Sequence, residues 1–189
     1  MIKFEVVNKF KDSKINLIPV RKTKYSAGYD MYVAKDIVIP PYIEIFSNII
    51  MSSRPEEMSL EDMANFTKTY KCRPSLVSTG VKCQLDPDTY LELSVRSSTP
   101  LKHLLFLANG VGIIDADYYN NEDNEGEIFF QLINLSPYPI RLKAGDCIGQ
   151  GIIKRYEKVD EDMAQNSRKG GFGSTDLDQL AHCLKDDGK

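Results

Sequence analysis

Short apolar segments divided by turn-forming residues are the feature that most limits how this sequence can fold. The segments are only a few residues long or alternate apolar and polar side chains, as β-strands do. Proline, glycine and aspartate separate them, for example at Pro40-Pro41, 86–88 and 144–146. The predicted strands are 2–7, 30–33, 37–39, 43–49, 76–82, 90–95, 127–133 and 148–155. Many short, closely spaced strands favour an all-β barrel or double-sheet fold.

One segment departs from the strand pattern. Ser59 is followed three residues later by Asp62, which is close to a capping box, and the next apolar residues follow helical spacing. We therefore expect a helical insertion at 54–73, and a second helical stretch at 176–185. The length of 189 residues suits a single β domain, expected over 1–166, with a flexible glycine-rich arm and tail over 167–189.

Composition narrows the possible partners. The formal net charge of −3 provides no bulk attraction for nucleic acid. The longest apolar runs are far below the ~20 residues that span a bilayer, and the N-terminus lacks a signal-peptide pattern. The cysteines have no zinc-ligand spacing with either histidine and are interpreted as reduced thiols; they are Cys72, Cys83, Cys147 and Cys183. We expect a cytoplasmic protein that binds neither nucleic acid nor membrane.

Two segments suit phosphate chemistry, although each also has a simpler structural explanation. Gly28 and Asp30 lead into a predicted strand and could form only a turn. Arg96, Ser97 and Ser98 end a strand where a helix is expected to begin, and hydroxyls with free amides at such a point form a plausible phosphate cradle. A helix N-cap beside a surface arginine would have the same pattern.

Three further segments are equally ambiguous when taken singly. Asp115 follows two isoleucines, where a general base could be held, but an Asx turn would look the same. Residues 141–150 form a turn and a strand that carries Gln150. In residues 167–176, glycines surround Phe172, with cations before and hydroxyls after, which suits a flap that covers a base and binds phosphates. It also suits a plain glycine-rich tail, and it is not a P-loop, because no Lys-Ser or Lys-Thr follows the glycines.

Together and in order, the five segments resemble the motifs of the trimeric dUTPase family, which read approximately AGYDL, RSG or RSS, GxIDxxYxGE, GxRIAQ and RGxGGFGSTG. Here the corresponding residues are 27–31, 96–98, 112–127, 145–150 and 168–175. The resemblance extends from about residue 2 to residue 175. It implies a jelly-roll-like subunit, a distorted barrel of the β-clip type, and a homotrimer whose active sites are each built from three chains.

The resemblance also implies an activity: Mg²⁺-dependent hydrolysis of dUTP to dUMP and pyrophosphate, which keeps uracil out of DNA and supplies dUMP for dTMP synthesis. Asp115 would be the base that activates the water attacking the α-phosphorus. Tyr118 would pack beneath the deoxyribose and leave no room for a ribose 2′-hydroxyl. The uracil edge would be read by Asn109 and by backbone from Gly112 through Ile114 to Tyr118.

The remaining roles concern the triphosphate. Asp30 would help to hold Mg²⁺, through water. The expected phosphate-binding residues of the β domain are Arg96, Ser97, Ser98 and Gln150, with Arg96 also counted as catalytic. The expected arm residues are Arg168, Phe172, Gly173, Ser174 and Thr175, with Phe172 over the uracil.

The sequence departs from the family pattern in three motifs. Seven residues, 119–125, separate Tyr118 from Gly126, where the family usually has one. Cys147 and Gly149 stand where arginine and alanine are common. The fifth motif is one residue shorter between Arg168 and Phe172.

Two alternatives remain at this point. A dCTP deaminase, or a bifunctional deaminase–dUTPase, shares the fold, but its chemistry needs a glutamate three residues before the asparagine of the strand 127–134. Here that residue is Gln131, which cannot transfer a proton. The other alternative is a regulatory protein of the same fold that binds a partner.

Overall fold

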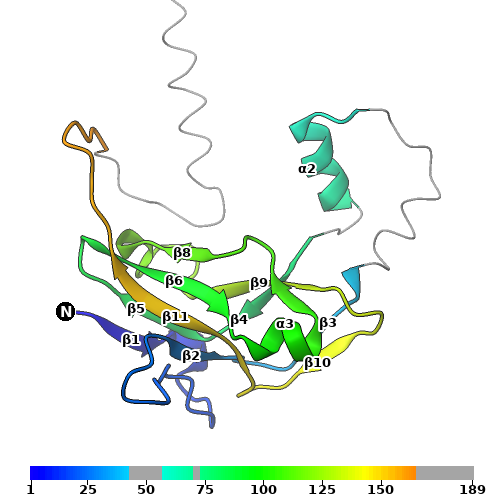
Figure 1. Ribbon diagram of the computed structural model, residues 1–189, viewed down its shortest axis with the longest axis horizontal. Coiled ribbons are helices and arrows are strands. Elements are labelled where there is room, and N and C mark those ends of the chain that lie inside the picture. The colour runs from blue at the N-terminus through cyan, green and yellow to red at the C-terminus, as the bar shows by residue number, and fades with distance from the viewer. Residues whose placement is uncertain (43–56, 70–72, 165–189) are drawn as a thin grey trace, which may run out of the picture.

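The computed structural model describes residues 1–42, 57–69 and 73–164. Within these ranges antiparallel strands dominate, and they form four small sheets (Figure 1). The largest has the order β2-β11-β6-β8 and consists of Tyr29–Tyr32, Cys147–Arg155, Thr89–Val95 and Gly112–Ile114. The second, β4-β9-β7, consists of Ser75–Ser78, Phe129–Asn134 and Leu105–Leu107. Two pairs complete the body: β1 (Lys3–Val6) with β5 (Val81–Gln84), and β10 (Ile140–Leu142) with β3 (Ile37–Ile39).

The core lies between these sheets. Side chains alternate along strands such as β9, so one face of the strand is buried in the core and the other is half-exposed. In β9, Phe130 and Leu132 are fully buried, whereas Phe129 and Gln131 on the opposite face are partly exposed. Buried aliphatic side chains from β2, β5, β6 and β11 complete one apolar cluster. The expected all-β class is therefore confirmed.

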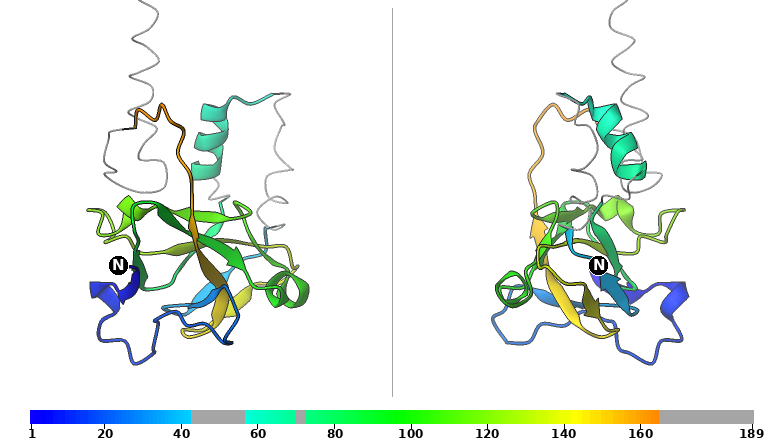
Figure 2. Two further views of the ribbon diagram at one scale, coloured as in Figure 1. Left: turned by 60° about the vertical axis from the view of Figure 1, so that its left-hand side comes forward. Right: turned by 90° about the vertical axis from the view of Figure 1, so that its right-hand side faces the viewer.

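The helices are short and peripheral. Helix α2 (Leu60–Thr69) projects from the sheets in both views of Figure 2. Its expected capping box is confirmed: the Asp62 N–H donates to Ser59 Oγ at 3.1 Å, and the Ser59 N–H donates to Asp62 Oδ2 at 3.3 Å. Helix α3 is Ser98–His103, and the 3-10 turns η1 and η2 are Asn8–Phe10 and Ala116–Tyr118. Among the helices of the described ranges, none is long and apolar enough to cross a membrane.

One predicted strand is wrong in its extent. Residues 76–82 do not form a single strand, because Gly80 adopts φ +68° and the chain turns from β4 into β5. A Cβ at Gly80 would lie 2.7 Å from Leu17 Cδ1, so the turn is tight as well as left-handed. The predicted strand 43–49, the predicted helix 176–185 and the whole predicted arm and tail, 167–189, lie outside the described residues.

Candidate active site

The first group of predicted site residues lies at one end of the four-stranded sheet. Asp30 in β2 is paired in register with Gln150 in β11, and β11 continues beside β6, whose last residue precedes Arg96. Arg96 Nε lies 3.6 Å from Asp30 Oδ1. The strand register thus brings together motifs that are distant in sequence. We call this group the Arg96 cluster; it consists of Asp30, Arg96, Ser97, Ser98 and Gln150.

Asp30 is the residue of this cluster suited to a metal ion. It is 6% exposed, and its Oδ2 is buried without a hydrogen-bond partner in the described part of the chain. A buried carboxylate oxygen that lacks a donor needs a ligand, such as a water bound to a cation. Residues 1–42, 57–69 and 73–164 contain no group of three His, Cys, Asp or Glu that could hold a metal. The donors fit Mg²⁺ held through water and substrate phosphates rather than a cage of side chains.

The Gln150 side chain, from the fourth motif, fills the space beside Gly28 of the first motif. The Gln150 side chain donates from Nε2 to Ser94 Oγ at 3.2 Å. A Cβ at Gly28 would lie 2.4 Å from Gln150 Oε1. The glycine of the first motif therefore leaves room for the glutamine of the fourth.

Ser97 occupies the N-cap position of α3 but its hydroxyl does not cap the helix. The simple capping explanation from the sequence therefore does not account for this side chain. Ser97 is exposed and Ser98 is half-buried, beside Arg96 at the same strand end. Both hydroxyls remain compatible with the predicted phosphate role.

Cys147, at the position where arginine is common, contacts the Arg96 guanidinium. A hydrogen bond with the Cys147 thiol, with the nearby charge of Asp30, raises the pKa of Arg96. Burial and the charge of Asp30 raise the pKa of Cys147 above its ordinary value, so the thiol is protonated at neutral pH. The cluster therefore has one arginine where the usual motif supplies two.

Gly149, at the position where alanine is common, is explained by its neighbour Phe130. A Cβ on Gly149 would lie 2.2 Å from Phe130 Cε1 and 2.7 Å from the backbone oxygen of Ser94. The large buried ring of Phe130 fills the volume that an alanine methyl would need.

We expect Gly149→Ala to lower the stability of the protein by about 1–3 kcal/mol, the usual cost of forcing extra atoms into a packed core. The thermal midpoint at one fixed protein concentration measures this effect. Gly151→Ala on the same strand is the matched control, because its Cβ would meet only the Leu91 side chain, at 2.9 Å from Cδ1, and neither an aromatic ring nor a backbone atom. A midpoint for Gly149→Ala equal to or above that of the control would contradict the packing argument.

The second group of predicted residues surrounds a cavity of about 130 Å³. That volume is well below the ~300–1,000 Å³ of pockets for drug-sized ligands, so it accommodates a single ring rather than a whole nucleotide. Gly112 is buried, and its lack of a Cβ leaves the backbone close to Leu93. We call this cavity the Tyr118 pocket; it is lined by Leu93, Asn109, Gly112, Ile113, Ile114, Tyr118, Phe129 and Gln131.

Asp115 and Tyr118 flank the turn that follows β8. Asp115 comes directly after Ile114, is half-exposed, and has extended backbone dihedrals of φ −78° and ψ 158°. Its carbonyl accepts the Tyr118 N–H at 3.2 Å, but its side chain does not cap η2. Tyr118 is 5% exposed, and its hydroxyl donates to the Glu127 carbonyl at 3.0 Å.

Three residues that line the pocket were absent from the predicted site: Leu93, Phe129 and Gln131. Phe129 and Gln131 are two apart in a strand, so the sequence predicts that they share one face. Nothing in the sequence indicates which face of β9 meets the turn after β8.

The structure does not bring the two groups together within one chain. Ile114, just before Asp115, is paired with Leu91, whereas Arg96 lies five residues further along β6. Asp115 lies one residue beyond Ile114, opposite residue 90, so at ~3.3 Å per strand residue Asp115 and Arg96 are separated by roughly 20 Å. The predicted arm residues, Arg168, Phe172, Gly173, Ser174 and Thr175, lie outside the described residues.

Fold and site together define a class of protein: an all-β subunit with a one-ring pocket and, apart from it, an arginine–aspartate pair whose carboxylate is suited to a metal ion. A family model described as dUTPase matches residues 62–176. The chain belongs to the dUTPase family.

Individual relatives agree with this assignment. Deoxyuridine 5′-triphosphate nucleotidohydrolase from Lactococcus lactis is 36% identical over 174 residues, which are 91% of this chain and 95% of the relative. The protein of the same name from Wolinella succinogenes is 37% identical over 164 residues, covering 84% of this chain and 86% of the relative. A crystal structure of dUTPase from Streptococcus mutans superposes with a TM-score of 0.64 at 33% identity, covering 84% of this chain and 98% of that chain. The expected jelly-roll-like fold is thereby confirmed.

Proposed function

We propose that this chain hydrolyses dUTP to dUMP and pyrophosphate. The observation that carries the proposal is the Tyr118 pocket, a one-ring cavity with amide side chains from Asn109 and Gln131 in its wall and Asp115 just beyond it. The names of the Lactococcus lactis and Wolinella succinogenes relatives support the same substrate.

The pocket suits uracil and deoxyribose for physical reasons. Asn109 and the backbone from Gly112 to Ile114 offer donors and acceptors to the edge of a base. A base with the wrong edge would leave these groups unpaired, which strongly disfavours it. The buried Tyr118 ring forms the flat surface expected beneath the sugar, where a 2′-hydroxyl would collide with it.

Asp115 is assigned the chemical step. Its carboxylate accepts a proton from a water molecule, which attacks the α-phosphorus, and pyrophosphate leaves. Because Asp115 follows a strand of the four-stranded sheet directly, its backbone is held in place by the β6–β8 pairing.

The separation of Asp115 from Arg96 supports an active site shared between chains. A group acting at the α-phosphorus must lie within a few ångströms of the phosphates that Arg96 would bind, and roughly 20 Å separates Asp115 from Arg96 along β6 in one chain. We therefore propose a homotrimer in which the Tyr118 pocket of one chain faces the Arg96 cluster of the next. The arm would complete each site from a third chain, with Phe172 over the uracil and Arg168, Gly173, Ser174 and Thr175 on the phosphates.

The Arg96 cluster is assigned to the phosphates and to Mg²⁺. Arg96, Ser97, Ser98 and Gln150 would hold phosphate oxygens, and Asp30 would hold Mg²⁺ through water. Mg²⁺, when bound, gathers and neutralises the charges of the triphosphate, which a protein with a net charge of −3 cannot do in bulk. Since deoxynucleotides are the substrates, we propose the cytoplasm as the location.

The deaminase alternative is disfavoured by the residue at the pocket wall. Gln131 lines the cavity at the point where a proton-transferring glutamate would be required. An amide cannot shuttle protons at neutral pH, so cytosine deamination lacks its catalyst. No observation specifically favours the regulatory alternative.

A nucleotide panel tests the proposed function directly. The purified chain with Mg²⁺ should release pyrophosphate from dUTP and much less from dTTP, dCTP or UTP, with no ammonia from dCTP. Chelation by EDTA should abolish the dUTP reaction, and added Mg²⁺ should restore it. Ammonia release from dCTP would favour the deaminase, and absence of any dUTP hydrolysis would favour the binding-only alternative.

A further inference from the structure

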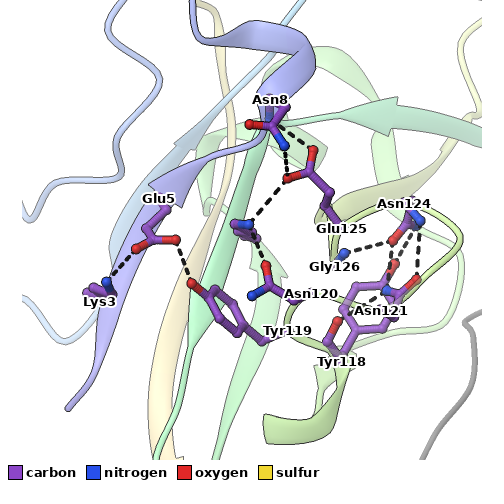
Figure 3. A network of polar contacts seen from close by, with 11 residues as sticks. Lys3, Glu5, Asn8, Tyr118, Tyr119, Asn120, Asn121, Asn124, Glu125 and Gly126 are labelled. Atoms are coloured by element: carbon purple, nitrogen blue, oxygen red, sulfur yellow. Dashed lines mark hydrogen bonds and ion pairs between the residues drawn. The ribbon is translucent and has the colours of Figure 1, made fainter.

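The loop 119–125, which lengthens this chain beyond the usual family pattern, contacts the ring of Tyr118. The Tyr118 hydroxyl uses both of its hydrogen-bonding modes. It donates to the Glu127 carbonyl at 3.0 Å, and it accepts from Asn124 Nδ2 at 2.8 Å (Figure 3). Asn124 belongs to the loop itself. The inserted residues thus bind the far end of the ring that forms part of the pocket wall.

The Asn124 amide is held in the orientation that this contact needs. Its Oδ1 accepts from the Gly126 N–H at 3.0 Å and from Asn121 Nδ2 at 2.8 Å, which directs the Nδ2 group to Tyr118. Asn121 is 8% exposed, and its own Oδ1 accepts the N–H groups of Asp123 and Asn124. The loop therefore holds the Asn124 Nδ2 donor in a fixed orientation toward Tyr118.

The backbone of the loop adopts conformations that side-chain-bearing residues rarely populate. Asn120 and Glu125 have φ of +58° and +60°, and Gly126 has φ of +78°. A Cβ on Gly126 would lie 2.4 Å from the Tyr118 carbonyl oxygen, so the loop returns tightly against the tyrosine. Such conformations persist only where the surroundings enforce them, and they cluster at functional sites.

Contacts with Asn8 and Lys82 hold the loop backbone in these conformations. Glu125 accepts from the Asn8 N–H at 2.9 Å and from Asn8 Nδ2 at 2.7 Å. Lys82 in β5 lies 3.3 Å from Glu125 Oε1 and also donates to Asn120 Oδ1. These contacts fix both ends of the loop to β5 and to η1, and Figure 3 shows the contact between Asn8 and Glu125.

We propose that Asn124 is a positioning residue that fixes the Tyr118 ring and thereby sets the discrimination between deoxyribose and ribose nucleotides. This inference rests on the proposed function. A pocket rejects one extra hydroxyl only weakly if its wall can move. A ring held at its Cβ can tilt, whereas a ring whose hydroxyl is also held by Asn124 and Glu127 resists the displacement that a 2′-hydroxyl would require.

Nucleotide selectivity of the full-length protein tests this role. We expect Asn124→Ala to reduce the ratio of kcat/KM for dUTP to kcat/KM for UTP by about 3- to 10-fold, the range that one neutral hydrogen bond supports. Tyr118→Phe removes the hydroxyl and leaves the loop's own hydrogen bonds intact, so it should reduce the ratio at least as much. The double variant should be no worse than Tyr118→Phe alone, because Asn124 acts through that hydroxyl.

Glu122→Ala provides the matched control, since this exposed loop residue should leave the ratio unchanged. An unchanged ratio in Asn124→Ala or in Tyr118→Phe would overturn the proposal, as would additive losses in the double variant. If Asn124→Ala does not fold, Tyr118→Phe alone still decides whether anchoring the hydroxyl matters. A wild-type protein with no preference for dUTP over UTP would instead contradict the proposed function.

Discussion

Asp115→Asn is expected to lower kcat for dUTP by about 10²- to 10⁴-fold, the contribution typical of a positioned general base. The amide has nearly the shape of the carboxylate but cannot accept a proton from water. Since the Asp115 side chain does not cap η2, its replacement should leave the turn to Tyr118 in place. Binding of dUTP, which depends on the pocket and on the phosphate groups, should persist.

Three measurements separate a chemical from a structural effect of this variant. Pyrophosphate release gives kcat, titration with a non-hydrolysable dUTP analogue gives Kd, and size-exclusion chromatography gives the oligomeric state. Asp117→Asn is the control, because Asp117 is an exposed carboxylate only two residues away. Near-normal turnover by Asp115→Asn, or an equal loss in the Asp117 control, would remove Asp115 from its assigned role.

Much of the fold could be predicted because its signals are local. The capping box of Ser59 and Asp62 lies within four residues, and most of the longer strands keep an alternating or apolar pattern that is visible in the sequence. Among the three-residue strands of the described ranges, β3 was predicted, whereas β7, β8 and β10 were missed, since so few residues give at most a weak period. The break at Gly80 depends on a left-handed turn that lies close to Leu17, a residue distant in the sequence.

The candidate site was predicted less completely, since its geometry depends on strand register. Motif order indicates which residues act, but not that β6 holds Asp115 and Arg96 at opposite ends. The contribution of Gln131 to the pocket depends on which face of β9 is covered. The Asn124–Tyr118 hydrogen bond depends on a loop conformation in which two residues are left-handed. The polar sequence of the loop does not indicate that conformation.

Mixing two inactive variants is expected to restore activity, because Arg96 and Asp115 would act from different chains. Arg96→Ala alone should lower kcat/KM for dUTP by about 10²- to 10³-fold, as removal of a donor aimed at developing charge typically does. Arg96→Lys should recover part of this loss, because it keeps the charge without the planar fork. Asp115→Asn alone should be similarly impaired.

In a mixed trimer of these chains, one site combines Arg96 from an Asp115→Asn chain with Asp115 from an Arg96→Ala chain. Cyclic symmetry therefore predicts roughly one third of the wild-type activity for each mixed trimer. Co-expression with two different affinity tags isolates such trimers, and the trimers of either single variant, purified identically, are the controls. If the mixed trimers stay as inactive as those controls, both groups act within one chain and the shared site is wrong. If activity returns only where the two variants are combined, the separation of Asp115 and Arg96 along β6 is bridged by the neighbouring subunit.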